Sequence, residues 1–331
     1  MRLLIDIVNY RTALWCIACL RSLLDEVRSI RDIHVVVADA DSRDGSVEQI
    51  NAAIGDEGWN GWVTVVPLER NGGFAFANNT IVRRALMSRD APEAVLFLNP
   101  DTLVKPGAIR SMLQVLEGAS GIGIVGSALE NMAGDLEVTG HQMIRPLSEL
   151  LRGARFDLLC RWFPRYVVSP RNTEQQRPFA CEWVSGAAMM VRREVFEQIG
   201  LLDEGYFLYF DEVDFCFRAM AAGWQIWHVP HSRIVHTQGA STGIQEGTCL
   251  PACWFESRRR FFVKNYGMGG LILADICWAI GRLSLHARQR LRLGGNACAD
   301  PKSLLFDILW RDAKAIMTGQ TFQIKSQGDL L

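Results

Sequence analysis

The stretch Ala94-Val95-Leu96-Phe97-Leu98-Asn99-Pro100-Asp101-Thr102 indicates how this chain folds. Its apolar first part predicts a buried strand, and its polar second part predicts a turn at the carboxyl end of that strand. The carboxylate of Asp101 stands at the tip of the turn. In an α/β sheet this position suits an oxygen ligand for a divalent cation that also holds phosphates. The same residues are also typical of an ordinary turn with a solvated aspartate. Other segments of the chain are needed to distinguish a metal ligand from such a turn.

The segments before this strand alternate between strands and helices. We expect strands at residues 3–8, 33–38, 63–67 and 94–98, and helices at 12–28, 46–54 and 76–88. This alternation predicts a parallel α/β sheet with right-handed crossovers, in which a ligand lies at the carboxyl ends of the strands. Polar residues follow each expected strand: Asn9-Tyr10, Asp39-Ala40-Asp41-Ser42, Arg70-Asn71-Gly72-Gly73 and Asn99-Pro100-Asp101.

The second half of the chain has a different pattern. We expect helices at 106–116, 193–199 and 211–222, strands at 122–125 and 187–191, and an edge strand at 225–229. The stretch 145–176 is rich in Arg and Pro and predicts an irregular excursion. Beyond residue 242 the chain is expected to be mostly helical.

Composition excludes several classes of protein. The chain has 331 residues, of which 49% are hydrophobic and 21% charged, as in globular rather than disordered proteins. The formal net charge of −1 gives no reason to expect nucleic acid as a partner. The nine cysteines have no regular framework, which favours free thiols in a reducing compartment. Cys16 and Cys19 form a CxxC in a leucine-rich helical stretch and are interpreted as core residues.

Several side chains suit ligand binding. Asp39 follows a very apolar strand and can accept a hydrogen bond from a base or a ribose hydroxyl, whereas Asp44 suits a helix cap. The glycines at 72–73 open a helix and let backbone N–H groups approach a phosphate or a sugar. His236 follows a second strand and is a plausible metal ligand beside Asp101. In each case a purely structural role is the alternative.

The acidic run Asp211-Glu212-Val213-Asp214 follows the aromatic run Tyr206-Phe207-Leu208-Tyr209-Phe210. Helix capping explains some of these acids, but three in four residues exceed what a cap needs. Aromatic neighbours exclude water and raise the pKa of a carboxyl group, which suits a general base.

Two motifs are decoys or ambiguous. Residues 121–126 match GxGxxG, but they are expected inside a strand rather than between a strand and a helix, so we reject a dinucleotide site. Arg258-Arg259-Arg260 and Lys264 lie among aromatic residues, and we interpret them as a face for acidic lipid or a diphosphate, with a solvated helix face as the alternative. The apolar stretch 268–285 contains Asp275 and Arg282, so a helix lying on protein or on a membrane face is favoured over a span.

Over residues 3–267 the chain resembles family 2 glycosyltransferases, particularly the rhamnosyltransferase-like bacterial members. The resemblance is carried by the order and spacing of several segments. These are residues 8–10, 19–23, 39–46, 71–79, 98–102, 183–193, 200–204 and 209–214, together with His236.

The resemblance implies a GT-A fold with a mostly parallel central sheet flanked by helices and a helical C-terminal extension. It implies a nucleotide-sugar-binding half, expected at 1–105, and an acceptor-binding and catalytic half, expected at 106–245. The basic aromatic stretch 254–266 and the apolar stretch 268–285 favour membrane contact by the extension at 246–331. The activity implied is inverting transfer of a sugar, with rhamnose the first expectation, from a nucleoside diphosphate donor to a lipid-linked or polysaccharide acceptor. The reaction is expected in the cytoplasm, at the inner face of the cell membrane. It would require Mg²⁺ or Mn²⁺.

The resemblance also implies roles for individual residues. Asp39 would contact the nucleobase, and Asp101 and His236 would hold the metal ion. The remaining donor-binding residues would be Asn9, Tyr10, Asp41, Asn71, Gly73, Phe74, Asn78 and Asn99. The acceptor would be bound by Trp183, Gly186 and Asp214.

The base would come from residues 211–214. Many family members have Glu-Asp where this chain has Asp211-Glu212, so the base is Glu212 or Asp211. Two other functions stay open: a sugar nucleotidyltransferase, which should have glycines after the first strand where this chain has Asn9-Tyr10-Arg11-Thr12, and a non-catalytic scaffold that binds nucleotide sugars.

Overall fold

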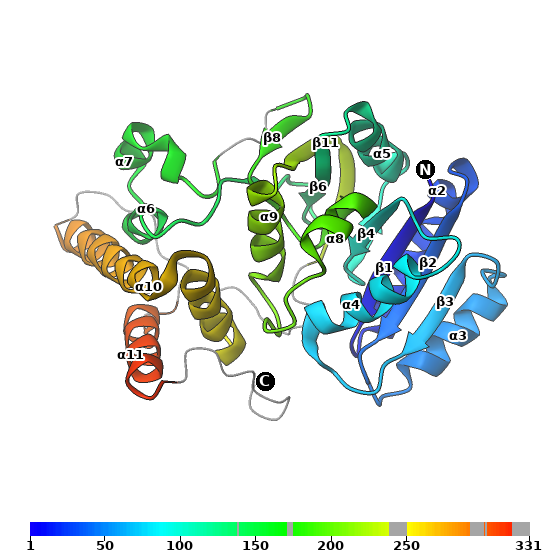
Figure 1. Cartoon of the computed structure of the whole chain (residues 1–331), viewed down its shortest axis with the longest axis horizontal. Helices are drawn as coiled ribbons and strands as arrows, with labels where there is room; N and C mark the ends of the chain where they lie inside the picture. Colours follow the sequence, from blue (N-terminus) through cyan, green and yellow to red (C-terminus); the bar gives the residue numbers. More distant parts are fainter. Residues whose placement is uncertain (138, 171–174, 238–249, 292–300, 302, 320–331) are drawn as a thin grey trace.

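A mixed sheet of nine strands forms the centre of the molecule (Figure 1). The computed structural model describes residues 1–137, 139–170, 175–237, 250–291, 301 and 303–319. The strand order is β3-β2-β1-β4-β10-β6-β11-β5, and β8 pairs with β11. The strands are β1 (Leu3–Asn9), β2 (Ile33–Asp39), β3 (Val63–Pro67), β4 (Ala94–Leu98), β5 (Thr102–Val104), β6 (Ile122–Glu130), β8 (Phe179–Cys181), β10 (Ala188–Arg192) and β11 (Gln225–His236). A separate pair is formed by β7 (Gly140–His141) and β9 (Trp183–Val184).

The parallel arrangement expected from the sequence is found in the first half of the sheet. Strands β3, β2, β1 and β4 run parallel to one another. Beyond them β10 runs antiparallel to both β4 and β6, while β11 is parallel to β6 and antiparallel to β5 and β8. The whole sheet is therefore mixed rather than mostly parallel.

The prediction of an edge strand at 225–229 is wrong, because β11 extends to His236 and lies inside the sheet. Its register against β6 shifts between Val229 and Arg233. Pro230 lies in this interval and has no N–H to donate, so the alternating pattern stops there although the strand continues. The second part of β11 pairs with β5, a strand that sequence analysis missed because it has only three residues.

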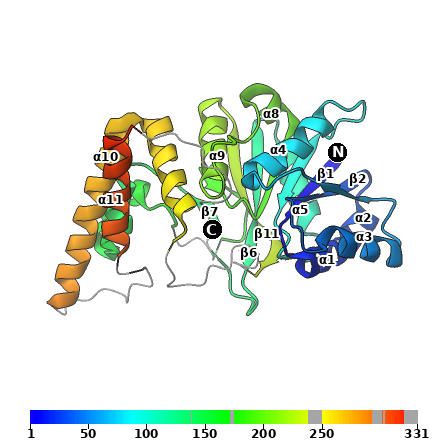
Figure 2. The ribbon, with the colours of Figure 1, turned by 90° about the horizontal axis from the view of Figure 1, so that it is seen from below.

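Helices cover both faces of the sheet (Figure 2). One face carries α1 (Ala13–Ser22), α2 (Leu24–Ser29), α3 (Ser46–Asp56) and α5 (Ala108–Gly118), and the other carries α4 (Gly73–Leu86), α8 (Arg193–Ile199) and α9 (Asp211–Ala221). Cys16 and Cys19 are buried in the first of these layers, as expected, and burial raises the pKa of Cys19 to about 12. The GxGxxG residues lie in and beside β6, so the rejection of a dinucleotide loop is confirmed.

Four further helices gather at the end of the molecule away from β3 (Figures 1 and 2). They are α6 (Ser148–Ala154), α7 (Asp157–Trp162), α10 (Ala252–Arg290), which bends at Gly267, and α11 (Leu304–Met317). Together with the 3-10 helix η1 (Pro164–Tyr166), α6 and α7 correct the prediction of an irregular stretch at 145–176. These segments are too short for a periodic pattern and depend on packing for their stability. The boundary expected between 245 and 246 lies outside the described residues.

Buried ion pairs join α6, α10 and α11. Arg258 has no exposed surface and donates hydrogen bonds to Glu149, Asp275 and Asp312. The neighbouring Arg259 is also buried and donates to Asp312. The interpretation of Arg258 and Arg259 as a face for lipid or diphosphate is therefore wrong. Their apolar neighbours, which suggested an exposed aromatic patch, instead exclude water from these ion pairs.

Candidate active site

The polar strand ends identified in the sequence meet at one edge of the sheet. Strand β1 lies between β2 and β4, with Asn9 opposite Asp39 and Ile7 opposite Leu98. Neighbouring strands are about 4.8 Å apart, so the ends of β2 and β4 are separated by about 10 Å. The loops that carry Asp39 and Asp101 therefore leave the same edge on the two sides of β1.

Asp39 is held in a buried network at the end of β2. Its Oδ1 accepts a hydrogen bond from the backbone N–H of Ser42 at 2.9 Å. Its Oδ2 accepts from Asn9 Nδ2 and from Ser42 Oγ, both at 2.7 Å. Asp39 is 2% exposed. These donors fix the orientation of the carboxylate, and its contact with a nucleobase remains a prediction.

The loops around this network have unusual backbone conformations. Arg11, Asp41 and Arg43 have φ values of 58°, 56° and 53°. Positive φ is uncommon for residues other than glycine and often marks functional loops. Tyr10, half-buried, lies under the guanidinium of Arg11 at 5.0 Å from its ring centroid. The predicted donor-binding residues Tyr10 and Asp41 are therefore in tightly specified loops at the edge of the sheet.

Asp101 and His236 are brought together by the pairing of β5 with β11, which places His236 opposite Thr102. His236 Nε2 lies 3.4 Å from Asp101 Oδ1 and 3.4 Å from Asn99 Nδ2. His236 Nδ1 is buried and has no hydrogen-bond partner. A carboxylate and an imidazole at this distance fit a divalent cation. The described residues contain no cluster of three or more His, Cys, Asp or Glu side chains, so other ligands would have to come from the donor or from water.

The glycine-bearing turn before α4 touches the loop that precedes the acidic run. Asn71 Oδ1 accepts a hydrogen bond from Gly73 N, and Phe74 N donates to Phe207 O at 2.9 Å. Gly73 has a φ of 87°, and a Cβ at this position would lie 2.1 Å from Phe207 O. Glycine is therefore required here by conformation and by space.

Two asparagines of α4 have different surroundings. Asn78 is fully buried, and its Nδ2 donates to Phe74 O while its Oδ1 has no partner. Sequence analysis did not single out Asn79. Its side-chain amide donates a hydrogen bond to the carbonyl oxygen of Leu202 and accepts one from the N–H of Leu202. Asn79 thus ties α4 to the segment that leads to the acidic run, and only its position next to Asn78 could have suggested this.

The acidic run begins α9 after two strained residues. Tyr209 and Phe210 have φ values of 69° and 62°, which are unfavourable for aromatic side chains. The pKa of Asp211 is raised well above its ordinary value, mainly by burial and to a smaller extent by the charge of the neighbouring Glu212. Burial also raises the pKa of Glu212, whereas its contact with Asp211 opposes that rise. The pKa of Asp211 is therefore raised further than that of Glu212, so Glu212 is the carboxyl group of this pair that ionises first.

The predicted acceptor-binding residues lie around Glu212 and behind it. A Cβ on Gly186 would lie 3.5 Å from Glu212 Cβ, so Gly186 leaves space beside this carboxyl group. Trp183 stacks on His141 with ring centroids 4.0 Å apart, and its Nε1 donates to Gln142 O. Both residues keep their predicted role as a proposal.

Asp214 has a different environment from that expected of an acceptor ligand. Its Oδ1 accepts hydrogen bonds from Tyr206 Oη and Asn265 Nδ2, and its Oδ2 accepts from Arg218 Nε and Lys264 Nζ at 3.0 and 2.8 Å. It has no exposed surface. Because both oxygens are occupied by protein donors, the contacts favour a positioning role over acceptor binding.

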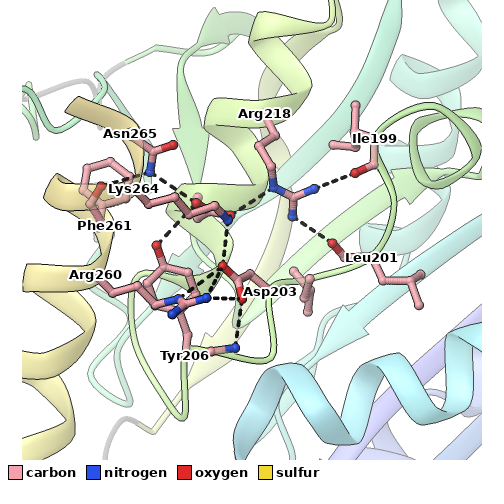
Figure 3. Close-up of polar contacts among 12 residues, drawn as sticks. Ile199, Leu201, Asp203, Tyr206, Arg218, Arg260, Phe261, Lys264 and Asn265 are labelled. Carbon is pink, nitrogen blue, oxygen red and sulfur yellow. Dashed lines mark hydrogen bonds and ion pairs between the residues drawn. The ribbon is translucent and has the colours of Figure 1, made fainter. Parts of the chain in front are cut away.

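Figure 3 shows how Lys264 and Arg260 extend this network to the preceding loop. Lys264 Nζ also donates to Asp203 Oδ2 at 2.7 Å, and Arg260 donates to both oxygens of Asp203. Burial alone would raise the pKa of Asp203, but these cationic donors lower it to about 2. The first half of α10 thus clamps the loop and helix that carry Asp211 and Glu212. The sequence signal was the spacing of four between Arg260 and Lys264, which places both on one helical face.

The chain was compared with known protein families and with curated proteins. A family model described as glycosyltransferase like family 2 matches residues 2–250. A curated relative from Mycobacterium tuberculosis, an N-acetylglucosaminyl-diphospho-decaprenol L-rhamnosyltransferase, is 29% identical over 274 residues, which are 79% of this chain and 84% of the relative.

Solved structures show the same fold. A mannosyltransferase from Pyrobaculum calidifontis in complex with GDP-Man and Mn²⁺ has a TM-score of 0.55 at 17% identity, covering 97% of this chain and 83% of that one. GalNAc-T7 with UDP, GalNAc and Mn²⁺ has a TM-score of 0.59 at 16% identity, covering 97% and 58%. The expected GT-A fold is confirmed. With the family model over most of its length and named transferases among its relatives, the chain belongs to glycosyltransferase family 2 and is an enzyme of the glycosyltransferase type.

Proposed function

We propose that this enzyme transfers a sugar, rhamnose in the first instance, from a nucleoside diphosphate donor to a hydroxyl group of a lipid-linked or polysaccharide acceptor, with inversion. The main support for the proposal is the pair formed by Asp101 and His236, whose Oδ1 and Nε2 atoms are 3.4 Å apart. The pair lies at the same edge of the sheet as Asp39, the last residue of β2. The relative from Mycobacterium tuberculosis, named as a rhamnosyltransferase with a lipid diphosphate acceptor, supports the choice of sugar and acceptor.

Asp101 and His236 would hold Mg²⁺ or Mn²⁺, and the Mn²⁺ in the structures of the two solved relatives supports a divalent ion. When bound, the ion would offset the negative charge that gathers on the leaving diphosphate. The unpartnered Nδ1 of His236 leaves the ring orientation to be set by its Nε2 contacts with Asp101 and Asn99.

Glu212 takes the proton of the attacking hydroxyl group in this proposal. Asp211 keeps its own proton, is 3% exposed, and stabilises the ionised form of Glu212. The space beside Gly186 admits the acceptor hydroxyl. Asn9 and Ser42 fix the orientation of Asp39, which would contact the base of the nucleotide, and Asn71 and Gly73 form the turn that would lie beside the donor. A positioned carboxylate of this kind contributes roughly 10²–10⁴-fold to the rate.

The proposed division of labour follows the chain. Residues 1–105 would bind the nucleotide sugar, 106–245 the acceptor, and the helical part from 246 would bring the enzyme to the cytoplasmic face of the membrane where a lipid-linked acceptor lies.

The test is a panel of nucleotide sugars with Mg²⁺, Mn²⁺ or a chelator, scored for thermal stabilisation and for slow release of the nucleoside diphosphate. We expect dTDP-rhamnose with a metal ion to stabilise the protein and to be hydrolysed slowly. Stabilisation without hydrolysis, with or without acceptor, would favour the non-catalytic scaffold. Formation of a nucleotide sugar from a sugar phosphate and a nucleoside triphosphate would favour the nucleotidyltransferase.

A further inference from the structure

The second half of α10 has its charged residues inside and its apolar residues outside. Between residues 268 and 285 the charged side chains are Asp275 and Arg282, which are 9% and 3% exposed. Asp275 accepts a hydrogen bond from Arg258 at 2.8 Å within the buried ion pairs. The large side chains on the outer face, 42–60% exposed, are Ile272, Leu273, Ile276, Ile280 and Leu283. Their spacing places them on one stripe of the helix, which we call the outer stripe.

The outer stripe is part of a wider concentration of exposed apolar surface. Among the described residues seventeen large hydrophobic side chains are exposed, and fourteen of them lie at 147–163 or 272–317. The described residues of these ranges belong to the helices at the end of the molecule away from β3 (Figure 1). Soluble proteins rarely gather so much apolar surface without a partner, so this end is an interaction surface.

Exposed aromatic residues also lie on two other helices at this end of the molecule, α7 and α11. Trp162 and Phe163, at the end of α7, are 67% and 50% exposed. Phe306 and Trp310 on α11 are 67% and 54% exposed and stack on each other with ring centroids 6.1 Å apart. Tryptophan and its aromatic relatives are enriched where a protein meets the headgroup level of a bilayer.

The charge of this end complements an acidic surface. In α7, η1, the last turn of α10 and α11, six basic side chains and two acidic ones are at least partly exposed. The basic residues include Arg161, Arg165, Arg290 and Lys314. This excess of positive charge contrasts with the chain as a whole, whose formal net charge is −1. An apolar stripe at the same end of the molecule as an excess of basic residues fits the interface of a membrane that contains acidic lipids.

The contacts of α10 argue against a span. Among the described helices α10 alone is long and apolar enough to cross a membrane by length and composition. Its inner face, however, is covered by α6 and α11, with Gly153 packed against the backbone at Trp278 and Trp278 packed against Leu304 and Ile308. A helix with one face buried in protein and ion pairs can lie in the interface but cannot pass through the hydrocarbon alone.

We propose that the outer stripe of α10, with the exposed aromatic residues of α7 and α11, lies in the headgroup region of an acidic membrane as a monotopic docking surface. This deepens the proposed function, on which the lipid-linked acceptor rests, by naming the surface that contacts the lipid. Over residues 268–285 the stripe is about 27 Å long, and it enters the bilayer by about 5–10 Å without crossing it.

The experiment measures binding of the full chain to phosphatidylcholine vesicles with and without phosphatidylglycerol, by flotation and by titration. We expect the wild type to bind the mixed vesicles more tightly. The double variant Ile276→Asn/Ile280→Asn should bind the mixed vesicles at least about tenfold more weakly. Each substitution removes an apolar side chain, about half of whose surface is exposed, from the contact with lipid. The matched control is Leu14→Asn/Met87→Asn, which changes two exposed apolar residues elsewhere and should bind as the wild type does.

The double variant Arg161→Gln/Arg165→Gln should lose about fivefold in binding for each arginine, and only on the vesicles that contain phosphatidylglycerol. Wild-type protein that ignores both vesicles, or stripe variants that bind equally well, would overturn the proposal. So would a wild-type dimer in buffer that the stripe variant converts to monomers, since a second copy would then cover this face.

Slow hydrolysis of the nucleotide sugar reports on the proposed function separately. Stripe variants that hydrolyse the donor normally but do not bind vesicles would support the surface and show that they fold. A protein that binds vesicles through the outer stripe but hydrolyses no donor would support the docking surface and contradict the proposed function.

Discussion

The unequal rise in the pKa of Asp211 and Glu212 makes the choice of base testable with two isosteric substitutions. Asp211 is 3% exposed and burial raises its pKa well above the ordinary value, so we expect Asp211→Asn to replace one neutral side chain with another of the same shape. Its amide can also donate toward Glu212. We expect the variant to keep its rate within about tenfold, a loss of less than about 1.4 kcal/mol in transition-state stabilisation.

Glu212→Gln should behave very differently, because it removes the carboxylate that takes the proton. We expect a rate loss of roughly 10²–10⁴-fold, or about 2.7–5.4 kcal/mol. Donor binding should survive, since the predicted donor contacts are at Asp39, Gly73 and Asp101. The assay is release of nucleoside diphosphate in the presence of acceptor, with donor-induced thermal stabilisation as the control for folding and binding.

The pH profile gives a second reading of the same pair. Burial raises the pKa of Glu212, so the wild-type rate should fall on the acid side at a pH above the ordinary value for a glutamate. Asp211→Asn should keep this acid limb, and the residual rate of Glu212→Gln should lack it. If Asp211→Asn instead lost as much rate as Glu212→Gln with donor binding intact, the base would be Asp211 and the assignment of the proton would be wrong.

Asp101→Ala should weaken donor binding in a metal-dependent way, seen as loss of the extra thermal stabilisation that Mg²⁺ or Mn²⁺ gives; unchanged metal dependence would remove it from this role. Gly73→Ala should destabilise the protein by at least about 1–3 kcal/mol in urea denaturation, because its Cβ would meet Phe207 O at 2.1 Å at a positive φ. Lys264→Met should cost about 1–3 kcal/mol in the same assay, because the buried Asp214 and the half-buried Asp203 each lose a cationic donor. Burial raises the pKa of Asp275 to about 6, so the free energy of unfolding should fall by about 3 kcal/mol as pH rises from about 4 through 6, and Asp275→Asn should lack this loss.

The first half of the fold could be predicted closely because each element carries its own local pattern. The predicted strands at 63–67 and 94–98 have the observed bounds, and the helix at 193–199 does as well. The helix expected at 12–28 is divided at Leu23, and α4 begins at Gly73, three residues earlier than expected. Element ends depend on caps and tertiary contacts, such as the approach of Phe207 to Gly73, which no local pattern records.

The candidate site was predictable where it depends on strand ends. Asn9, Asp39, Asn99 and Asp101 follow strands whose order in the sheet was not known, but parallel strands must end at one edge. His236 was expected beside Asp101 from its place after a second strand and from the resemblance to the family, but the three-residue strand β5 that pairs it there was not visible in the sequence. The strained backbone at 209–210 also has no signature in the residue types.

The direction in which a charged side chain points was the hardest property to predict, and α10 shows why. A run of three arginines beside aromatic residues is most simply solvated, because burying an unpaired guanidinium is prohibitive. The cost disappears only when carboxylates from elsewhere arrive in the right geometry, as Glu149 and Asp312 do from α6 and α11. Once those partners occupy the inner face of α10, the apolar residues of its second half have no interior left to enter. The buried ion pairs and the exposed outer stripe are therefore two consequences of one packing arrangement.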